Sequence, residues 1–163
     1  MKLTILILED EPEVRVALER DLMEFADTVR IEPAQDVADA WEVIDDIAAD
    51  GDVLALALCD HRLPGTTGVD FLVEMMDDER TASTRKVLVT GQADLKDTVR
   101  AVNKAQLDHY IAKPWDADEL RNTVRECLTD YVEQIGVNPL PFMPALEADR
   151  AMDLMRNRSV GDW

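Results

Sequence analysis

Short apolar runs alternate along this chain with longer segments whose apolar residues recur at helical spacing, and this alternation constrains the fold most strongly. The run 3–8 is followed by helical spacing over 11–25. Four more pairs follow, namely 28–31 with 36–49, 53–59 with 69–78, 86–90 with 95–104, and 109–112 with 116–135. Strands that alternate with helices predict an α/β fold, with a parallel sheet covered on both faces and right-handed crossovers.

Polar residues end the predicted strands, where sheets of this kind place their functional crevice. They are Glu9, Asp10, Asp60, Thr90 and Lys113. Three carboxylates in one crevice repel each other, so a proton or a cation must bind among them. Oxygen ligands suit Mg²⁺, while an ammonium and a hydroxyl group provide what a phosphoryl group needs. The strand ends therefore predict a magnesium-dependent phosphoryl site.

Four stretches resemble the receiver domain of bacterial response regulators, with the chemotaxis regulators as the nearest type. They are ILILEDEP at 5–12, ALCDHRLPG at 57–65, VLVTG at 87–91 and YIAKPW at 110–115. The resemblance implies a flavodoxin-like, doubly wound (βα)5 parallel sheet with strand order 2-1-3-4-5 and a C-terminal helical tail. On this basis we assign residues 1–130 to a receiver domain and residues 131–163 to a C-terminal extension.

The resemblance also implies a role for each acidic residue. Asp60 is the phosphoacceptor and, with Asp10, a direct ligand of Mg²⁺. Glu9, which stands where an aspartate is commoner, contributes through water, and the backbone carbonyl of Arg62 completes the metal shell. Arg62 and Gln92 occupy positions that tune the lifetime of the aspartyl phosphate in this family.

The remaining matched residues belong to the switch of the family. Thr90 is expected to move toward the phosphoryl group, while Tyr110 turns inward to fill the space that Thr90 leaves. Lys113 is expected to pair with a phosphoryl oxygen, and its bond to Pro114 is expected to be cis. The resemblance therefore assigns catalytic roles to Asp60, Thr90 and Lys113.

The implied function is that of a response regulator in a two-component phosphorelay. A histidine kinase or phosphotransfer protein donates to Asp60, and the change alters binding of a downstream protein target. Beyond self-catalysed phosphotransfer and autodephosphorylation, no enzyme activity is implied. The alternative is a receiver-like interaction or dimerisation module that is not phosphorylated. A haloacid-dehalogenase-like phosphatase would need an aspartate where Arg62 stands, and a flavin module would need a phosphate cradle where the first acidic residues stand.

Net charge narrows the class of partner. The formal charge of -18 would repel a nucleic-acid backbone and an anionic membrane surface, so a protein or a cation is expected to bind. The apolar runs are too short to span a membrane or to form a secretory signal, which predicts a cytoplasmic protein. Cys59 and Cys127 lack metal-ligand spacing and are expected to be reduced core residues.

The tail after the last predicted helix is open to two interpretations. Its three prolines predict an extended linker over 137–144, followed by a short helix over 145–156 and a loose end over 157–163. The tail either folds back on its own domain, or it contributes to a homodimer or a partner interface.

Several conspicuous residues have ordinary structural interpretations. His61 lacks a second histidine or a cysteine nearby and is expected to be a loop residue. Gly65 and Gly68 are expected to serve a turn and a helix entry rather than a phosphate cradle. Trp115 is expected either to pack under the last predicted helix or to anchor a partner.

Overall fold

Five parallel strands form the central sheet of the computed structural model, which describes residues 1–91 and 95–161. In spatial order they are β2 Arg30–Ala34, β1 Leu3–Leu8, β3 Val53–Cys59, β6 Arg85–Thr90 and β7 His109–Ala112. Among these five strands the order is 2-1-3-4-5, as predicted. Two further short strands, β4 Arg62–Leu63 and β5 Thr66–Thr67, form a small antiparallel hairpin that was not predicted from the sequence.

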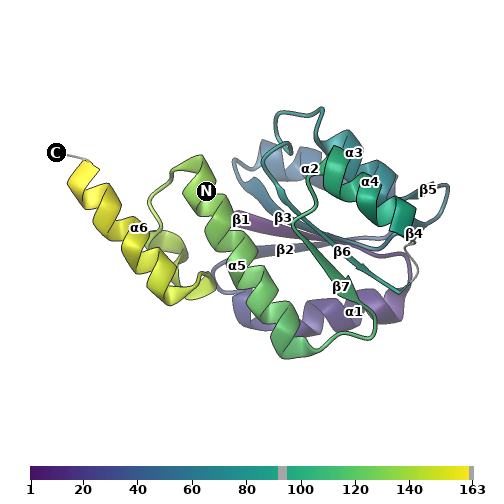
Figure 1. Ribbon diagram of the computed structural model, residues 1–163, viewed down its shortest axis with the longest axis horizontal. Helices are drawn as coiled ribbons and strands as arrows, with labels where there is room; N and C mark the ends of the chain where they lie inside the picture. Colours follow the sequence, from purple (N-terminus) through teal and green to yellow (C-terminus); the bar gives the residue numbers. More distant parts are fainter. Residues whose placement is uncertain (92–94, 162–163) are drawn as a thin grey trace.

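Helices cover both faces of the sheet. They are α1 Pro12–Asp21, α2 Val37–Ala49, α3 Gly68–Met75, α4 Leu95–Ala105 and α5 Ala117–Ile135, with a 3₁₀ turn η1 at Met23–Phe25. Figure 1 shows α1 and α5 on one face, and α2, α3 and α4 on the other. The flavodoxin-like receiver architecture predicted from the sequence is therefore confirmed.

β1 is apolar at every position except Thr4, because both faces of this strand are covered. Leu3, Ile5 and Ile7 pack in the cluster beneath α1 and α5. Leu6 and Leu8 pack in the cluster on the other face, beneath α2 and α3. Alternate residues of a strand point to opposite faces, so a strand covered on both sides needs no polar positions.

Three helices begin where the sequence supplies a capping side chain. Asp36 accepts a hydrogen bond from the backbone N–H of Asp39 at 2.8 Å, at the start of α2. Thr67 caps α3 in the same way, and Asp116 caps α5. Each cap satisfies an amide that the first helical turn leaves unpaired.

The proline-containing segment of the tail is not extended, which corrects the sequence prediction. Residues Leu140–Ala145 form a 3₁₀ turn, η2, and the helix α6 runs from Ala148–Gly161 through most of the end expected to be loose. Residues 162–163 lie outside the described part. Proline fixes φ near a value that helical and extended backbones share, so burial of Phe142, which is 5% exposed, favours the compact form.

The tail folds back on its own domain. Four of its side chains, Phe142, Ala145, Leu146 and Ala151, belong to the core cluster beneath α1 and α5. The buried hydroxyl group of Thr129 on α5 accepts a hydrogen bond from the backbone N–H of Glu147 at 2.9 Å. α6 therefore begins at a fixed point on α5, and Figure 1 shows it at the end of the molecule away from α3 and α4.

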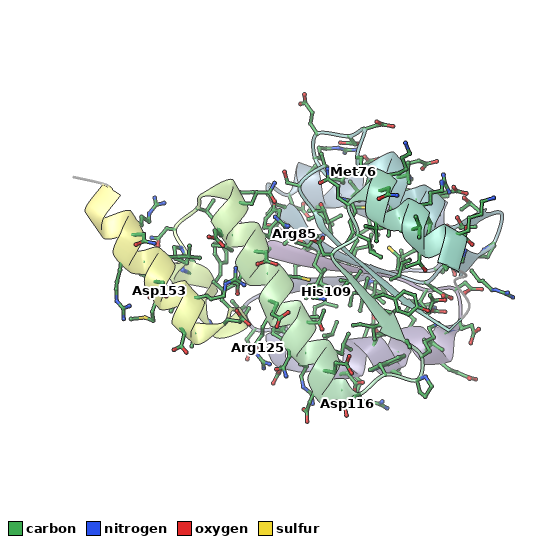
Figure 2. The ribbon with its side chains drawn as sticks, viewed as in Figure 1. Met76, Arg85, His109, Asp116, Arg125 and Asp153 are labelled. Atoms are coloured by element: carbon green, nitrogen blue, oxygen red, sulfur yellow. The ribbon has the colours of Figure 1, made fainter. Side chains whose placement is uncertain are left out.

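Charged side chains connect α5 with α6 and with η1. Arg150 of α6 donates to Asp130 of α5 at 2.7 Å. Nearer the start of α5, Arg125, labelled in Figure 2, lies with its guanidinium carbon 5.2 Å from the centre of the Phe25 ring. Asp153, also labelled there, marks the far side of the molecule on α6. These contacts hold α5 against both the tail and η1.

Lys86 is an unusual core residue, because its side chain is 1% exposed in β6. Its Nζ donates to the carbonyl oxygens of Thr84 at 2.8 Å and Ala82 at 3.4 Å. Burial disfavours the charged ammonium and lowers the pKa of Lys86 to about 8, although the charge of Asp108 opposes this shift.

Replacing Lys86 by methionine is expected to remove a pH dependence of stability. Between the folded pKa of about 8 and the ordinary value of 10.5, the unfolded chain holds more protons on this lysine, so the contribution of Lys86 to the free energy of unfolding rises with pH. The shift corresponds to a gain of about 3 kcal/mol. Urea unfolding on either side of this interval measures the gain, and the exposed residue Lys96, replaced by methionine, is the control. A Lys86→Met protein with the wild-type pH dependence would contradict the prediction.

Candidate functional site

Three carboxylates meet at the carboxyl edge of the sheet. Glu9 and Asp10 follow β1 and Asp60 follows β3, and each offers an oxygen within 4.8 Å of the other two. Glu9 is 1% exposed and Asp60 6%, whereas Asp10 is half-buried. A cleft of about 460 Å³ opens beside them, lined by Asp10, Glu11, Val14, Asp60, Arg62, Thr90, Gly91, Lys113 and Pro114.

Lys113 reaches this cluster from the loop after β7. Its Nζ lies 2.8 Å from Oε2 of Glu9 and 3.4 Å from Oδ2 of Asp60. Burial opposes the charge on Lys113, but the hydrogen bond to Glu9 and the charge of Asp60 outweigh it and raise the pKa of the lysine. The bond between Lys113 and Pro114 is cis, as expected. The direct pairing of Lys113 with Glu9 was not anticipated from the sequence.

The balance of charge at the cluster favours a bound cation. Burial raises the pKa of the Glu9 carboxyl and the nearby charge of Asp60 adds to this, although Lys113 opposes both. One ammonium faces three carboxylates, so negative charge is left over in a partly dry crevice. A divalent cation with oxygen ligands relieves that excess, and the donor set fits Mg²⁺.

Backbone contacts fix the position of Asp60. Its N–H donates to the carbonyl oxygen of Leu8 at 3.0 Å, and the N–H of Gly68 donates to the carbonyl oxygen of His61 at 2.8 Å. A Cβ at Gly68 would lie 1.9 Å from the carbonyl oxygen of Asp60, so only glycine allows α3 to approach this closely. Gly65, with φ at +78°, forms the turn between β4 and β5. Both glycines have the structural roles that the sequence suggested.

Thr90 and Tyr110, the expected switch pair, lie on the neighbouring strands β6 and β7. Thr90 is buried at the end of β6. Tyr110 is 41% exposed, and its hydroxyl group donates to the backbone carbonyl oxygen of Thr90 at 3.1 Å. Tyr110 is therefore turned outward here, in contact with the residue to which the resemblance couples it.

The other residues singled out in the sequence fall around this cluster. Arg62 is exposed and lines the cleft, whereas Gln92 lies outside the described residues. Trp115 packs against the core and donates to Asp21 at 2.8 Å, which favours the packing interpretation. His61 is in a loop, as expected, but its burial was missed: it is 6% exposed, and its Nε2 lies 3.0 Å from Oδ2 of Asp97.

Two further expectations concern the whole chain. Cys59 and Cys127 are buried and free of disulfide bonds, and burial raises the pKa of both thiols. Among the described residues, no helix combines the length and the apolar composition that crossing a membrane requires.

Comparison with known proteins gives consistent results. The family described as "Response regulator receiver domain" matches residues 5–125. A hydrogenase transcriptional regulatory protein, HoxA, of Cupriavidus necator is 33% identical over 96% of this chain and 30% of its own length. The corresponding protein of Bradyrhizobium diazoefficiens is 30% identical over 78% of this chain and 24% of its own length. The chain thus spans less than a third of these longer relatives.

Solved structures show the same likeness. A CheY-like response regulator receiver domain protein from Methanospirillum hungatei superimposes with a TM-score of 0.70 at 25% identity, covering 82% of this chain and 99% of that one. The signal receiver domain of an HD domain-containing protein from Pseudomonas fluorescens gives a TM-score of 0.72 at 23% identity, covering 83% and 93%. The similarity to the Pseudomonas fluorescens domain shows the fold alone.

Proposed function

The chain belongs to the response regulator receiver domain family, and from this we propose that it accepts a phosphoryl group on Asp60 with the help of Mg²⁺. The observation that carries the proposal is the meeting of Glu9, Asp10 and Asp60 within 4.8 Å, with Lys113 in contact with two of them. Family membership makes the chain part of a two-component response regulator. The residue roles below are our proposals.

The three carboxylates have different proposed roles in binding the metal. Asp10 and Asp60 bind Mg²⁺ directly, together with the backbone carbonyl of Arg62. Glu9 is engaged by Lys113 at 2.8 Å, which supports a contribution through water rather than direct ligation. Bound Mg²⁺ neutralises charge on the phosphoryl oxygens and the acceptor.

Asp60 provides the attacking oxygen. A carboxylate needs no base to remove a proton, so phosphotransfer depends on positioning and on charge neutralisation. The backbone contacts that fix Asp60 supply the positioning, and Lys113, 3.4 Å away, supplies a positive charge that stabilises the phosphoryl group. The same groups support self-catalysed loss of phosphate to water.

Thr90 and Tyr110 couple phosphorylation to the surface. The Thr90 hydroxyl group moves to donate to a phosphoryl oxygen, and Tyr110 leaves its outward position to occupy the space that opens. Phosphorylation thereby favours one of two arrangements of the face formed by α4, β7 and α5. The 41% exposure of Tyr110 supports an outward arrangement of this face before phosphorylation.

Proteins are the proposed partners on both sides of the reaction. A histidine kinase or phosphotransfer protein donates the phosphoryl group in the cytoplasm, and a downstream protein binds the changed face. The charge of -18 supports a protein target for this part of the chain rather than nucleic acid. We divide the chain into a receiver domain, 1–130, and an extension, 131–163, a boundary supported by the family match ending at 125.

Intact mass spectrometry after incubation with acetyl phosphate tests the proposal. One phosphoryl adduct is expected with Mg²⁺ and none with a chelator, and peptide mapping should place it on the peptide that contains Asp60. Asp52→Asn, at the opposite end of the sheet, is the matched control and should retain the adduct. If neither acetyl phosphate nor a purified cognate kinase gives an adduct, the domain is an unphosphorylated interaction module instead.

A further inference from the structure

His61, the residue directly after the proposed phosphoacceptor, connects the acceptor loop to α4. Its side chain is 8% exposed, and its Nε2 lies 3.0 Å from Oδ2 of Asp97 in the first turn of α4. An ionised carboxylate can only accept hydrogen bonds, so Nε2 is the donor. One part-buried hydrogen bond thus joins the loop after β3 to a helix of the proposed output face.

The His61 end of this contact cannot move independently of Asp60. The carbonyl oxygen of His61 accepts a hydrogen bond from Gly68 at 2.8 Å, at the entry to α3. The carbonyl oxygen of Asp60 lies so close to Gly68 that a Cβ there would be 1.9 Å away. With its backbone fixed on both sides, the His61 ring follows the position of the acceptor.

The α4 end is held more weakly. Among the side chains described on this helix, Ala101 and Ala105 are the buried ones, and a methyl group buries little apolar area. Arg100 donates to Asp70 of α3 at 2.5 Å, but both side chains are more than 40% exposed, where ion pairs contribute little. The contact from the acceptor loop therefore adds to a modest set of contacts described for α4.

The His61 ring is only half satisfied in this position. Within the described part of the chain, its buried Nδ1 has no hydrogen-bond partner. An unpaired buried nitrogen costs free energy, so this position of the ring is less favourable than one in which both nitrogens are hydrogen-bonded. The contact with Asp97 therefore holds the ring at a cost, which a rearrangement of the acceptor loop could relieve.

We propose that the hydrogen bond between His61 and Asp97 holds α4 in its unphosphorylated arrangement and that phosphorylation acts partly by breaking it. The proposal rests on the phosphoacceptor role of Asp60. This coupling is distinct from the one through Thr90 and Tyr110. It runs from Asp60 to α4 through His61 in the loop after β3, whereas Thr90 and Tyr110 lie on β6 and β7. Loss of the contact shifts the population toward the active arrangement before any phosphoryl group arrives.

Amide hydrogen exchange in the unmodified protein tests the first half of the proposal. Exchange of the α4 amides is expected to become about five- to tenfold faster in His61→Leu and in Asp97→Ala, without further increase in the double variant. His61→Gln keeps an N–H donor and should remain near wild type. Unchanged exchange, or effects that multiply in the double variant, would overturn the proposal; the half-exposed Asp97 keeps the test valid if His61→Leu folds poorly.

A titration with beryllofluoride in the presence of Mg²⁺, followed by the backbone amide resonance of Thr90, tests the coupling to Asp60. His61→Leu and Asp97→Ala are expected to reach half saturation at about five- to tenfold lower concentration than wild type. An unchanged midpoint in a responsive wild-type protein overturns the coupling alone. A wild-type protein that does not respond overturns the role of Asp60 as well as the coupling.

Discussion

Asp60→Asn is expected to reduce phosphoacceptance to background while leaving the fold intact. The amide oxygen of asparagine is a far weaker nucleophile than a carboxylate, and the neutral side chain no longer helps to hold Mg²⁺. The variant also relieves the repulsion among three carboxylates within 4.8 Å of one another, although it loses the contact with Lys113 at 3.4 Å. The two effects oppose each other, so the free energy of unfolding without metal should change by no more than about 1 kcal/mol.

Two measurements check this expectation on the same samples. Intact mass after incubation with acetyl phosphate and Mg²⁺ reports the adduct, and urea unfolding in chelator reports the stability. Asp36→Asn is a suitable control, because it makes the same chemical change at the N-cap of α2, outside the carboxylate cluster. It should leave the adduct unchanged. An adduct on Asp60→Asn at the wild-type level would show that another residue is the acceptor.

Phe142→Ala is expected to destabilise the domain by about 3–5 kcal/mol, the usual cost of removing a buried phenylalanine. Phe142 is 5% exposed and belongs to the core cluster beneath α1 and α5, although it lies outside the part of the chain that matches the family. A typical domain has only about 5–15 kcal/mol of stability, so the loss should be visible as a large shift of the urea midpoint.

The neighbouring residue Leu140 provides the matched control. It lies in the same 3₁₀ turn but is 60% exposed, so Leu140→Ala should change the free energy of unfolding by less than about 0.5 kcal/mol. Equal costs for the two substitutions would mean that the tail is not docked in solution. A large cost at Phe142 alone would make residues 140–151 a structural part of the domain.

The sheet and the acidic site could be predicted because local patterns determine them. The strand ends follow from runs such as 53–59, and parallel topology brings the residues after Leu8 and Cys59 to the same edge. The hairpin at 62–67 could not be predicted in this way, since strands of two residues carry no periodicity.

Features that depend on tertiary packing could not be predicted from the sequence. The burial of His61 requires Asp97, a residue 36 positions away, to lie above it, and no local pattern reports that. Residues 137–144 of the tail were predicted to be extended from their three prolines. Prolines favour extended and 3₁₀ backbone alike, however, and only the space that receives Phe142 distinguishes the two. The position of the Tyr110 side chain likewise depends on its contact with β6, which no local sequence pattern predicts.

α5 separates the acidic crevice from the docked tail, so that the two lie at opposite ends of the molecule. The helix begins at Asp116, beside the crevice, and its 19 residues span about 28 Å before Gly136 turns the chain. The tail then docks at the opposite end of the sheet (Figure 1). The proposed kinase would therefore meet no obstruction from α6 when it covers the crevice, and the exposed side of α6 would stay accessible while Asp60 is phosphorylated.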